Sequence, residues 1–131
     1  MGFNSFPKSV NAEGSEGSKN NLIRLRKEYS LGGDATVLGQ LGGIIAQFEN
    51  EWFEQNKERV GGYETLTPAQ MTERDKYVSS INQMHIRDII NERIKFCEDD
   101  IGNLNESEVE REISKNYKKA LEKIRMKLSS A

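Results

Sequence analysis

The sequence predicts an all-α protein: a small bundle of three to four helices, with two or three long antiparallel helices and an extended N-terminal tail. Three observations support this prediction. Large apolar residues recur at steps of three and four along most of the chain. Capping residues and glycines stand where helices would begin and end. The charged fraction of 31% is high for a globular protein and typical of long, solvated helices.

Length and composition restrict the class of protein further. A chain of 131 residues is long enough for one domain with its own core, and its net charge of −2 provides no overall attraction to nucleic acid or anionic membrane. Because Cys97 is the single cysteine, an internal disulfide framework and a cysteine-rich zinc site are excluded. No apolar run approaches the length of a membrane span, and the chain does not begin with a signal-peptide pattern. We expect a protein of the cytoplasm, or of a particle assembled in the cytoplasm.

The N-terminal segment, residues 1–20, is rich in Gly, Ser and Asn, and we predict that it lies outside the helical domain formed by residues 21–131. Such a segment buries too little apolar surface to offset the entropy cost of ordering it. It is therefore either a flexible tail or an arm that lies along a partner. Phe3, Phe6 and Val10 would anchor such an arm.

The first two helices are predicted on either side of a glycine-containing turn. A short helix begins after Asn20 or Asn21 and ends before the sequence LGGD at 31–34. The second helix is predicted from Ala35 to Val60, capped by Asp34 and ended by the glycine pair that follows it. Its apolar stripe consists of Val37, Leu38, Leu41, Ile44, Ile45, Phe48 and Trp52.

The third helix has the clearest start in the chain. Thr67 is the predicted cap, Pro68 takes the first helical position, and Gln70 completes a capping box. No glycine or proline follows until Gly102, so we predict one unbroken helix that ends at Ile101. It would carry two apolar stripes: Tyr77, Val78, Ile81 and Met84 on one side, and Ile86, Ile90, Ile94, Cys97 and Ile101 on another. Two stripes are typical of the central helix of a bundle, or of a helix that also contacts a neighbouring subunit.

The fourth helix is predicted after the sequence LNESE, with Asn105 as the cap and Glu108 completing the capping box. Acidic residues fill its first turns and basic residues its last turns, which suits the helix dipole. One apolar stripe is formed by Val109, Ile113, Tyr117, Ala120, Leu121, Ile124 and Leu128.

Small residues form a stripe on the opposite side of the second helix: Ala35, Gly39, Gly42 and Ala46. We predict that this stripe lets another helix approach closely, so that the second helix packs on both sides, because a solvated face would more naturally carry Lys, Glu or Gln. One alternative is a bent loop before a helix that begins near Ile44. A phosphate-binding loop is disfavoured, because neither a preceding strand nor a phosphate-loop motif is present.

The residues that could carry chemistry do not converge. His85 is the single histidine and lacks the further nitrogen or sulfur ligands that a metal would need. Cys97 precedes an acidic run, which disfavours the reactive thiolate, so a packing role is expected. The segment 99–108 resembles a calcium-binding loop in composition but lacks the required glycine. We therefore predict no catalytic, cofactor-binding or metal site, and a protein that is not an enzyme.

The leading functional hypothesis is a non-enzymatic helical subunit of a larger assembly, or a small protein-binding adaptor; a structural or accessory component of a phage particle is one concrete form. The predicted partner is a protein or a second copy of the chain. The predicted interface consists of Ala35, Gly39, Gly42, Ala46, Ile86, Ile90 and Ile94.

The alternative hypothesis is an accessory factor that binds nucleic acid through the basic end of the fourth helix. The residues involved would be Lys115, Lys118, Lys119, Lys123, Arg125 and Lys127.

Overall fold

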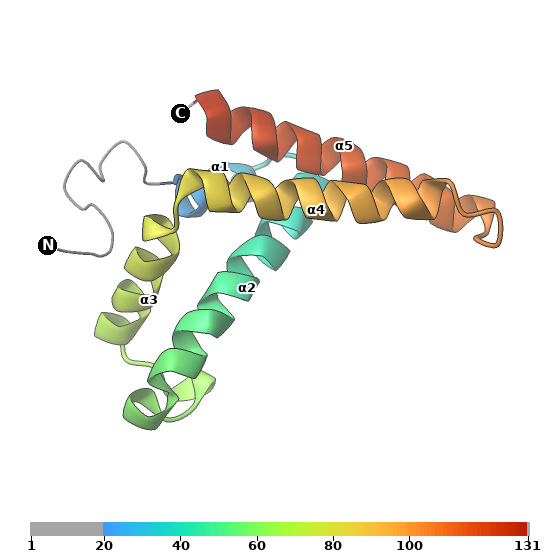
Figure 1. Ribbon diagram of the computed structural model, residues 1–131. Coiled ribbons are helices and arrows are strands. Elements are labelled where there is room, and N and C mark those ends of the chain that lie inside the picture. The colour runs from blue at the N-terminus through green and yellow to red at the C-terminus, as the bar shows by residue number, and fades with distance from the viewer. Residues whose placement is uncertain (1–19, 131) are drawn as a thin grey trace, which may run out of the picture.

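The computed structural model describes residues 20–130, which form five α-helices, one short 3-10 turn and no strand (Figure 1). The predicted arm over residues 1–20 lies outside the described residues, apart from Asn20. The all-α prediction is confirmed, with one helix more than expected. The helices are α1 (Leu22–Ser30), α2 (Ala35–Val60), α3 (Pro68–Ser80), α4 (Gln83–Ile101) and α5 (Glu108–Ser130), and the turn η3 (Tyr63–Thr65) follows α2.

Helix α2 has the predicted boundaries. The Asp34 carboxylate accepts hydrogen bonds from the backbone N–H groups of Thr36 and Val37, at 2.9 and 3.3 Å, and so caps the first turn. Gly61 ends the helix with φ at 76°, a conformation that favours glycine. The apolar stripe from Val37 to Trp52 is buried, except for the half-buried Leu38. The alternative of a loop before Ile44 is wrong.

The predicted third helix is two helices, because the chain turns at Ile81 and Asn82. Both residues have extended backbone, with ψ at 133° and 135°. The Asn82 side chain accepts a hydrogen bond from the backbone N–H of Met84 at 2.8 Å and caps α4. The expected single helix is therefore wrong. The first of its two predicted stripes is divided between α3, the turn and α4, and the second lies on α4 alone.

Asn20 connects the start of α1 to this turn. Its side-chain amide donates hydrogen bonds to the carbonyls of Val78 and Ile81, at 2.8 and 2.7 Å. Its side-chain oxygen accepts from the backbone N–H of Leu22 at 3.0 Å. The Val78 carbonyl also accepts from the backbone N–H of Ile81 at 3.3 Å. Asn20 is buried, so its amide helps to satisfy the carbonyls at the break between α3 and α4.

The cap of α5 lies two residues beyond the predicted one. The Ser107 hydroxyl accepts a hydrogen bond from the backbone N–H of Glu110, and the Glu110 carboxylate accepts from the backbone N–H of Ser107, both at 3.1 Å. These reciprocal bonds make a capping box from Ser107 and Glu110, whereas Asn105 and Glu108 were expected. Serine at the cap is as favourable as asparagine, so local preference did not distinguish the two registers.

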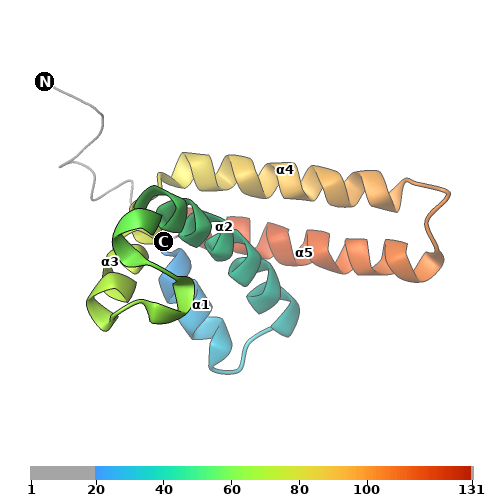
Figure 2. The ribbon, with the colours of Figure 1, turned by 90° about the horizontal axis from the view of Figure 1, so that it is seen from below.

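The main hydrophobic core lies where all five helices meet, and α4 and α5 form a long antiparallel hairpin that leaves it (Figures 1 and 2). Buried side chains from α1, α2 and the end of α3 pack against the beginning of α4 and the end of α5. A second, smaller cluster joins the far end of α2 to the segment before α3 through Trp52, Val60 and Leu66. This arrangement fixes α2 at one end of the hairpin and leaves the other end projecting.

Candidate interaction surface

The α4–α5 hairpin is covered by the other helices over only part of its length. Helix α5 has 23 residues and α1 has 9, so their lengths are about 35 Å and about 14 Å. The buried apolar residues of α5 begin at Ala120 and end at Leu128. Figures 1 and 2 show the N-terminal half of α5 beside α4, with α2 leading away from both. Within residues 20–130, no third helix covers this half of the hairpin.

An apolar stripe runs along the N-terminal half of α5, formed by Val109, Ile113 and Tyr117; we name it the uncovered stripe. These side chains are 69%, 43% and 43% exposed. Steps of four residues place them on one face of the helix, which Ala120 and Ile124 continue into the core. The stripe predicted from the sequence is therefore continuous along α5, but the core formed by residues 20–130 uses only its C-terminal half.

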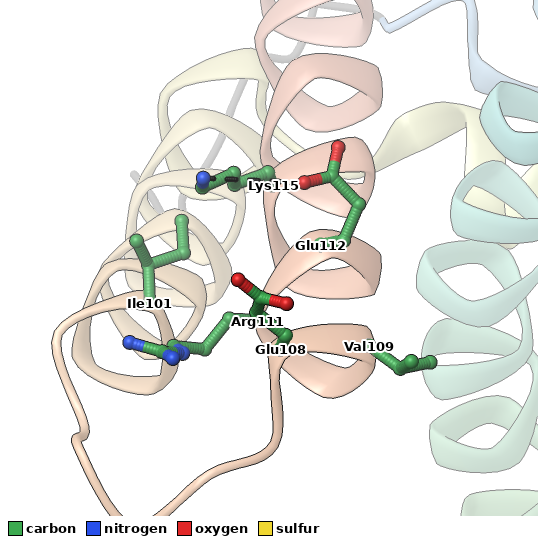
Figure 3. Close-up of a pocket in the computed structure, with 6 residues that line it drawn as sticks. All are labelled: Ile101, Glu108, Val109, Arg111, Glu112 and Lys115. Carbon is green, nitrogen blue, oxygen red and sulfur yellow. Dashed lines mark ion pairs between the residues drawn. The ribbon is translucent and has the colours of Figure 1, made fainter.

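The side chains at the projecting end show that the uncovered stripe does not face α4. In Figure 3, Arg111 and Lys115 reach from α5 toward α4, whereas Val109 points away from Ile101 and the α4–α5 contact. The hollow at this end is lined mainly by charged side chains. Two more exposed apolar residues, Phe96 on α4 and Leu104 in the connecting loop, lie in the same part of the hairpin.

The loop end of the hairpin is acidic. The first turns of α5 and the residues just before it carry Glu106, Glu108, Glu110 and Glu112. A hydrogen bond that protonated Glu106 donates to the Glu110 carboxylate, together with the negative charge of Glu110, raises the pKa of Glu106. The backbone N–H of Ser107 lowers the pKa of Glu110. The carboxyl groups are thus close enough to perturb one another, and they give this end of the hairpin a negative potential.

The six basic residues predicted to bind nucleic acid do not form one row of unpaired cations. Lys118 forms an ion pair with Glu98 at 3.0 Å, and this contact raises the Lys118 pKa. Lys123 pairs with Asp34 at 3.4 Å. Lys115 lies 3.9 Å from the Glu112 carboxylate, and the Arg125 guanidinium donates to the Asn91 side chain at 2.6 Å. Lys119 and Lys127 are exposed, and the described part of the chain contains no ion pair for either.

The stripe of small residues on α2 lies on the outside of the single chain. Ala35, Gly39 and Ala46 are exposed, and Gly42 is half-buried. A Cβ atom added at Gly39 or Gly42 would meet nothing within 4 Å in the described residues. Residues 20–130 therefore do not pack against both sides of helix α2. Contact between this stripe and another subunit remains a prediction.

The three isoleucines that complete the predicted interface lie in the chain's own core. Ile86, Ile90 and Ile94 are all buried among side chains of the main cluster. The reason is the turn at Asn82, which gives α4 a direction different from that of α3 and so turns this stripe toward the core. A surface that contains these three residues is thus not open in the folded single chain, and their part in an interface stays a prediction.

Within residues 20–130, no group of three or more His, Cys, Asp or Glu side chains is arranged so that it could hold a metal ion. Burial raises the pKa of the Cys97 thiol, and the nearby charge of Asp100 raises it further, so the thiolate is disfavoured. His85 places its ring against Phe48 in an edge-on arrangement, with ring centroids 5.9 Å apart. The hollow shown in Figure 3 is an open one between two helix ends.

No protein-family model, curated protein or solved structure matches this chain. Among the helices formed by residues 20–130, none combines the length and the apolar character that crossing a membrane would require. The surface is therefore interpreted from its own residues.

The uncovered stripe was present in the sequence pattern, but its exposure was not predicted. Besides α4, the helix that packs on α5 is α2, which then leads away from the hairpin (Figure 1). The length of the apolar repeat in α5 did not indicate this, because the direction in which α2 leaves the hairpin is a tertiary feature.

Proposed function

We propose that the chain is a non-enzymatic helical subunit that binds a protein through the uncovered stripe of α5. The single observation that supports this proposal is the continuation of the core stripe past the core. Val109, Ile113 and Tyr117 repeat at helical spacing, yet the described chain does not cover them. A contiguous apolar face of this kind is typical of an interaction surface, whereas isolated exposed apolar residues are common everywhere.

The composition of the stripe also suits a protein partner. Tyrosine is enriched in protein interfaces, since its ring supplies apolar area while its hydroxyl tolerates a wet rim. Charged side chains border the stripe, including Glu112 and Lys119, which are suited to the polar edge of such an interface. The hairpin projects beyond the core (Figure 2) and the side chains of the stripe are exposed, so a partner can reach them without unfolding the chain.

The test compares a stripe variant with a matched surface variant. Ile113→Ser with Tyr117→Ser removes apolar area from the stripe, and Leu31→Ser with Met71→Ser removes two exposed apolar side chains elsewhere. Light scattering measures the mass of each purified protein, and affinity purification from its native extract recovers partners.

We expect a stoichiometric complex with another protein or with itself for the wild type and the Leu31/Met71 variant, and its loss for the Ile113/Tyr117 variant. Circular dichroism checks that both variants keep their helix content. A complex that forms equally well with the stripe variant would refute the proposal. A clean monomer with no recovered partner would refute it too.

Nucleic-acid binding through α5 is the second candidate. Two of the predicted contact residues, Lys119 and Lys127, form no ion pair within the described residues. It takes second place because most of the other predicted contacts are already engaged within the chain. If it is correct, affinity for DNA or RNA falls steeply from low to moderate salt. A gel-shift assay that shows no complex at low salt would exclude it.

A further inference from the structure

We propose that the partner of the uncovered stripe is a second copy of this chain, lying antiparallel so that two α4–α5 hairpins form a four-helix layer. This inference rests on the proposed function and adds the identity and orientation of the partner. The starting point is geometric: the projecting half of the hairpin consists of two helices (Figure 2), and residues 20–130 leave the apolar stripe of α5 uncovered. Two such hairpins joined stripe to stripe bury both stripes between their α5 helices, as neighbouring helices do in antiparallel bundles.

The spacing of the stripe suits a twofold arrangement centred on Ile113. Val109 and Tyr117 lie four residues before and after it. In an antiparallel pair about this centre, Val109 of each copy lies opposite Tyr117 of the other, and the two Ile113 side chains meet. An interface of this type uses the same patch on both copies, so it closes at a dimer.

Charge selects the antiparallel orientation over the parallel one. Glu108, Glu112 and Lys119 are separated by four and seven residues, so they lie along one flank of α5 beside the stripe. Lys119 is six residues after Ile113, and Glu108 is five residues before it. An antiparallel pair therefore brings Lys119 of each copy close to Glu108 of the other. A parallel pair would instead place the acidic ends together, with like charges opposed.

The same arrangement offers a place for the exposed loop between the hairpin helices. Leu104 in this loop is 88% exposed. The antiparallel register brings the loop of the second copy to the level of residues 119–124. A hollow between the start of α2 and α5 opens at this level, and Ala120 and Met126 supply apolar atoms to its lining. Met126 is itself exposed in the single chain.

The first experiment measures self-association of the full chain by sedimentation equilibrium from about 5 to about 500 µM. We expect a dimer with twice the chain mass of 14.9 kDa. Ile113→Glu places like charges at the twofold centre, so it weakens the dimer by about tenfold or more. Met71→Glu, at an equally exposed apolar residue on α3, leaves the dimer unchanged. Circular dichroism establishes that both variants are folded.

The second experiment tests orientation by charge reversal and keeps the proposal falsifiable if Ile113→Glu does not fold. Lys119→Glu and Glu108→Lys each oppose like charges in a homodimer, so each variant alone dimerises more weakly than the wild type. When the two variants are mixed, the two substituted side chains face each other with opposite charges. The unchanged Glu108 of one copy then faces the unchanged Lys119 of the other, so a heterodimer forms in preference to either homodimer. Added salt reduces this preference.

The remaining outcomes overturn the inference. If the dimer persists with Ile113→Glu, the two copies meet through another face. If the mixture of charge variants shows no preference for the heterodimer, the two copies pack in another orientation. A wild-type monomer at every concentration excludes a second copy as the partner. In that last case, stripe-dependent recovery of a different protein from the native extract would still support the proposed function, so the two failures are distinguishable.

Discussion

Two glycines in the middle of α2 provide a quantitative test of where the helix surface is open. Gly39 and Gly42 lie well inside α2 and do not have the positive φ that would require glycine. A Cβ atom at either position meets no neighbouring atom within 4 Å in residues 20–130. The Gly39→Ala, Gly42→Ala double variant therefore gains the helix preference of alanine without a clash.

The expected gain follows from that preference. Each replacement of a helix-interior glycine by alanine contributes about 0.8–1.0 kcal/mol, so the pair raises the free energy of unfolding by about 2 kcal/mol. For a chain of this size, each kcal/mol raises the melting temperature by roughly 4 °C. Thermal unfolding followed by far-UV circular dichroism in dilute solution then shows an increase of roughly 8 °C.

Gly61→Ala is the matched control, because Gly61 has φ at 76° at the end of the same helix. A side chain there is strained, so this variant melts at a lower temperature than the wild type. A melting temperature that falls in the Gly39/Gly42 alanine variant would refute the assignment of both positions to an open helix face.

Leucine at the same positions tests the predicted subunit contact. If the small-residue stripe is an interface, Gly39→Leu or Gly42→Leu disrupts assembly more than helix content, which light scattering and circular dichroism measure together. Normal assembly with equal or greater stability would exclude the stripe as an interface.

Three further predictions concern single side chains. Asn20→Ala removes the buried amide that donates to the carbonyls of Val78 and Ile81, so it lowers the free energy of unfolding by about 1–3 kcal/mol in a denaturant titration; an unchanged midpoint would contradict this role. The backbone N–H groups of Val37 and Thr36 lower the pKa of Asp34 in the folded protein. The ionised carboxylate therefore stabilises the fold at pH values above the unfolded pKa of about 3.9. This stabilisation is lost as the pH falls through the lower pKa of the folded state. The comparison is with Asp34→Asn, which keeps a capping side chain. The difference in free energy of unfolding between the wild type and this variant is therefore largest near neutral pH and shrinks below about pH 4. A difference that does not depend on pH would refute this prediction. The Cys97 thiol, buried and with a raised pKa, reacts with a thiol-specific chromogenic reagent far more slowly in the native protein than in denaturant, and equal rates would show that it is accessible.

The sequence alone determined the features that depend on neighbouring residues. The boundaries of α2 follow from Asp34, whose carboxylate caps the helix, and from Gly61, which adopts the left-handed conformation that ends it. The cap of α3 at Thr67 was predicted for the same reason, and its side chain accepts from the backbone N–H of Gln70 at 3.1 Å. Such contacts span a few residues, so the pattern of residue types is enough to locate them.

Tertiary structure decided the features for which several local solutions have similar energy. The turn at Asn82 interrupts a segment without glycine or proline, and the buried amide of Asn20, distant in sequence, satisfies the carbonyls at that turn. The extent to which the α5 stripe is covered depends on the direction in which α2 leaves the hairpin, which no residue of α5 specifies. Periodicity predicts that a helix face is apolar, but only packing between distant segments decides whether the same chain buries that face.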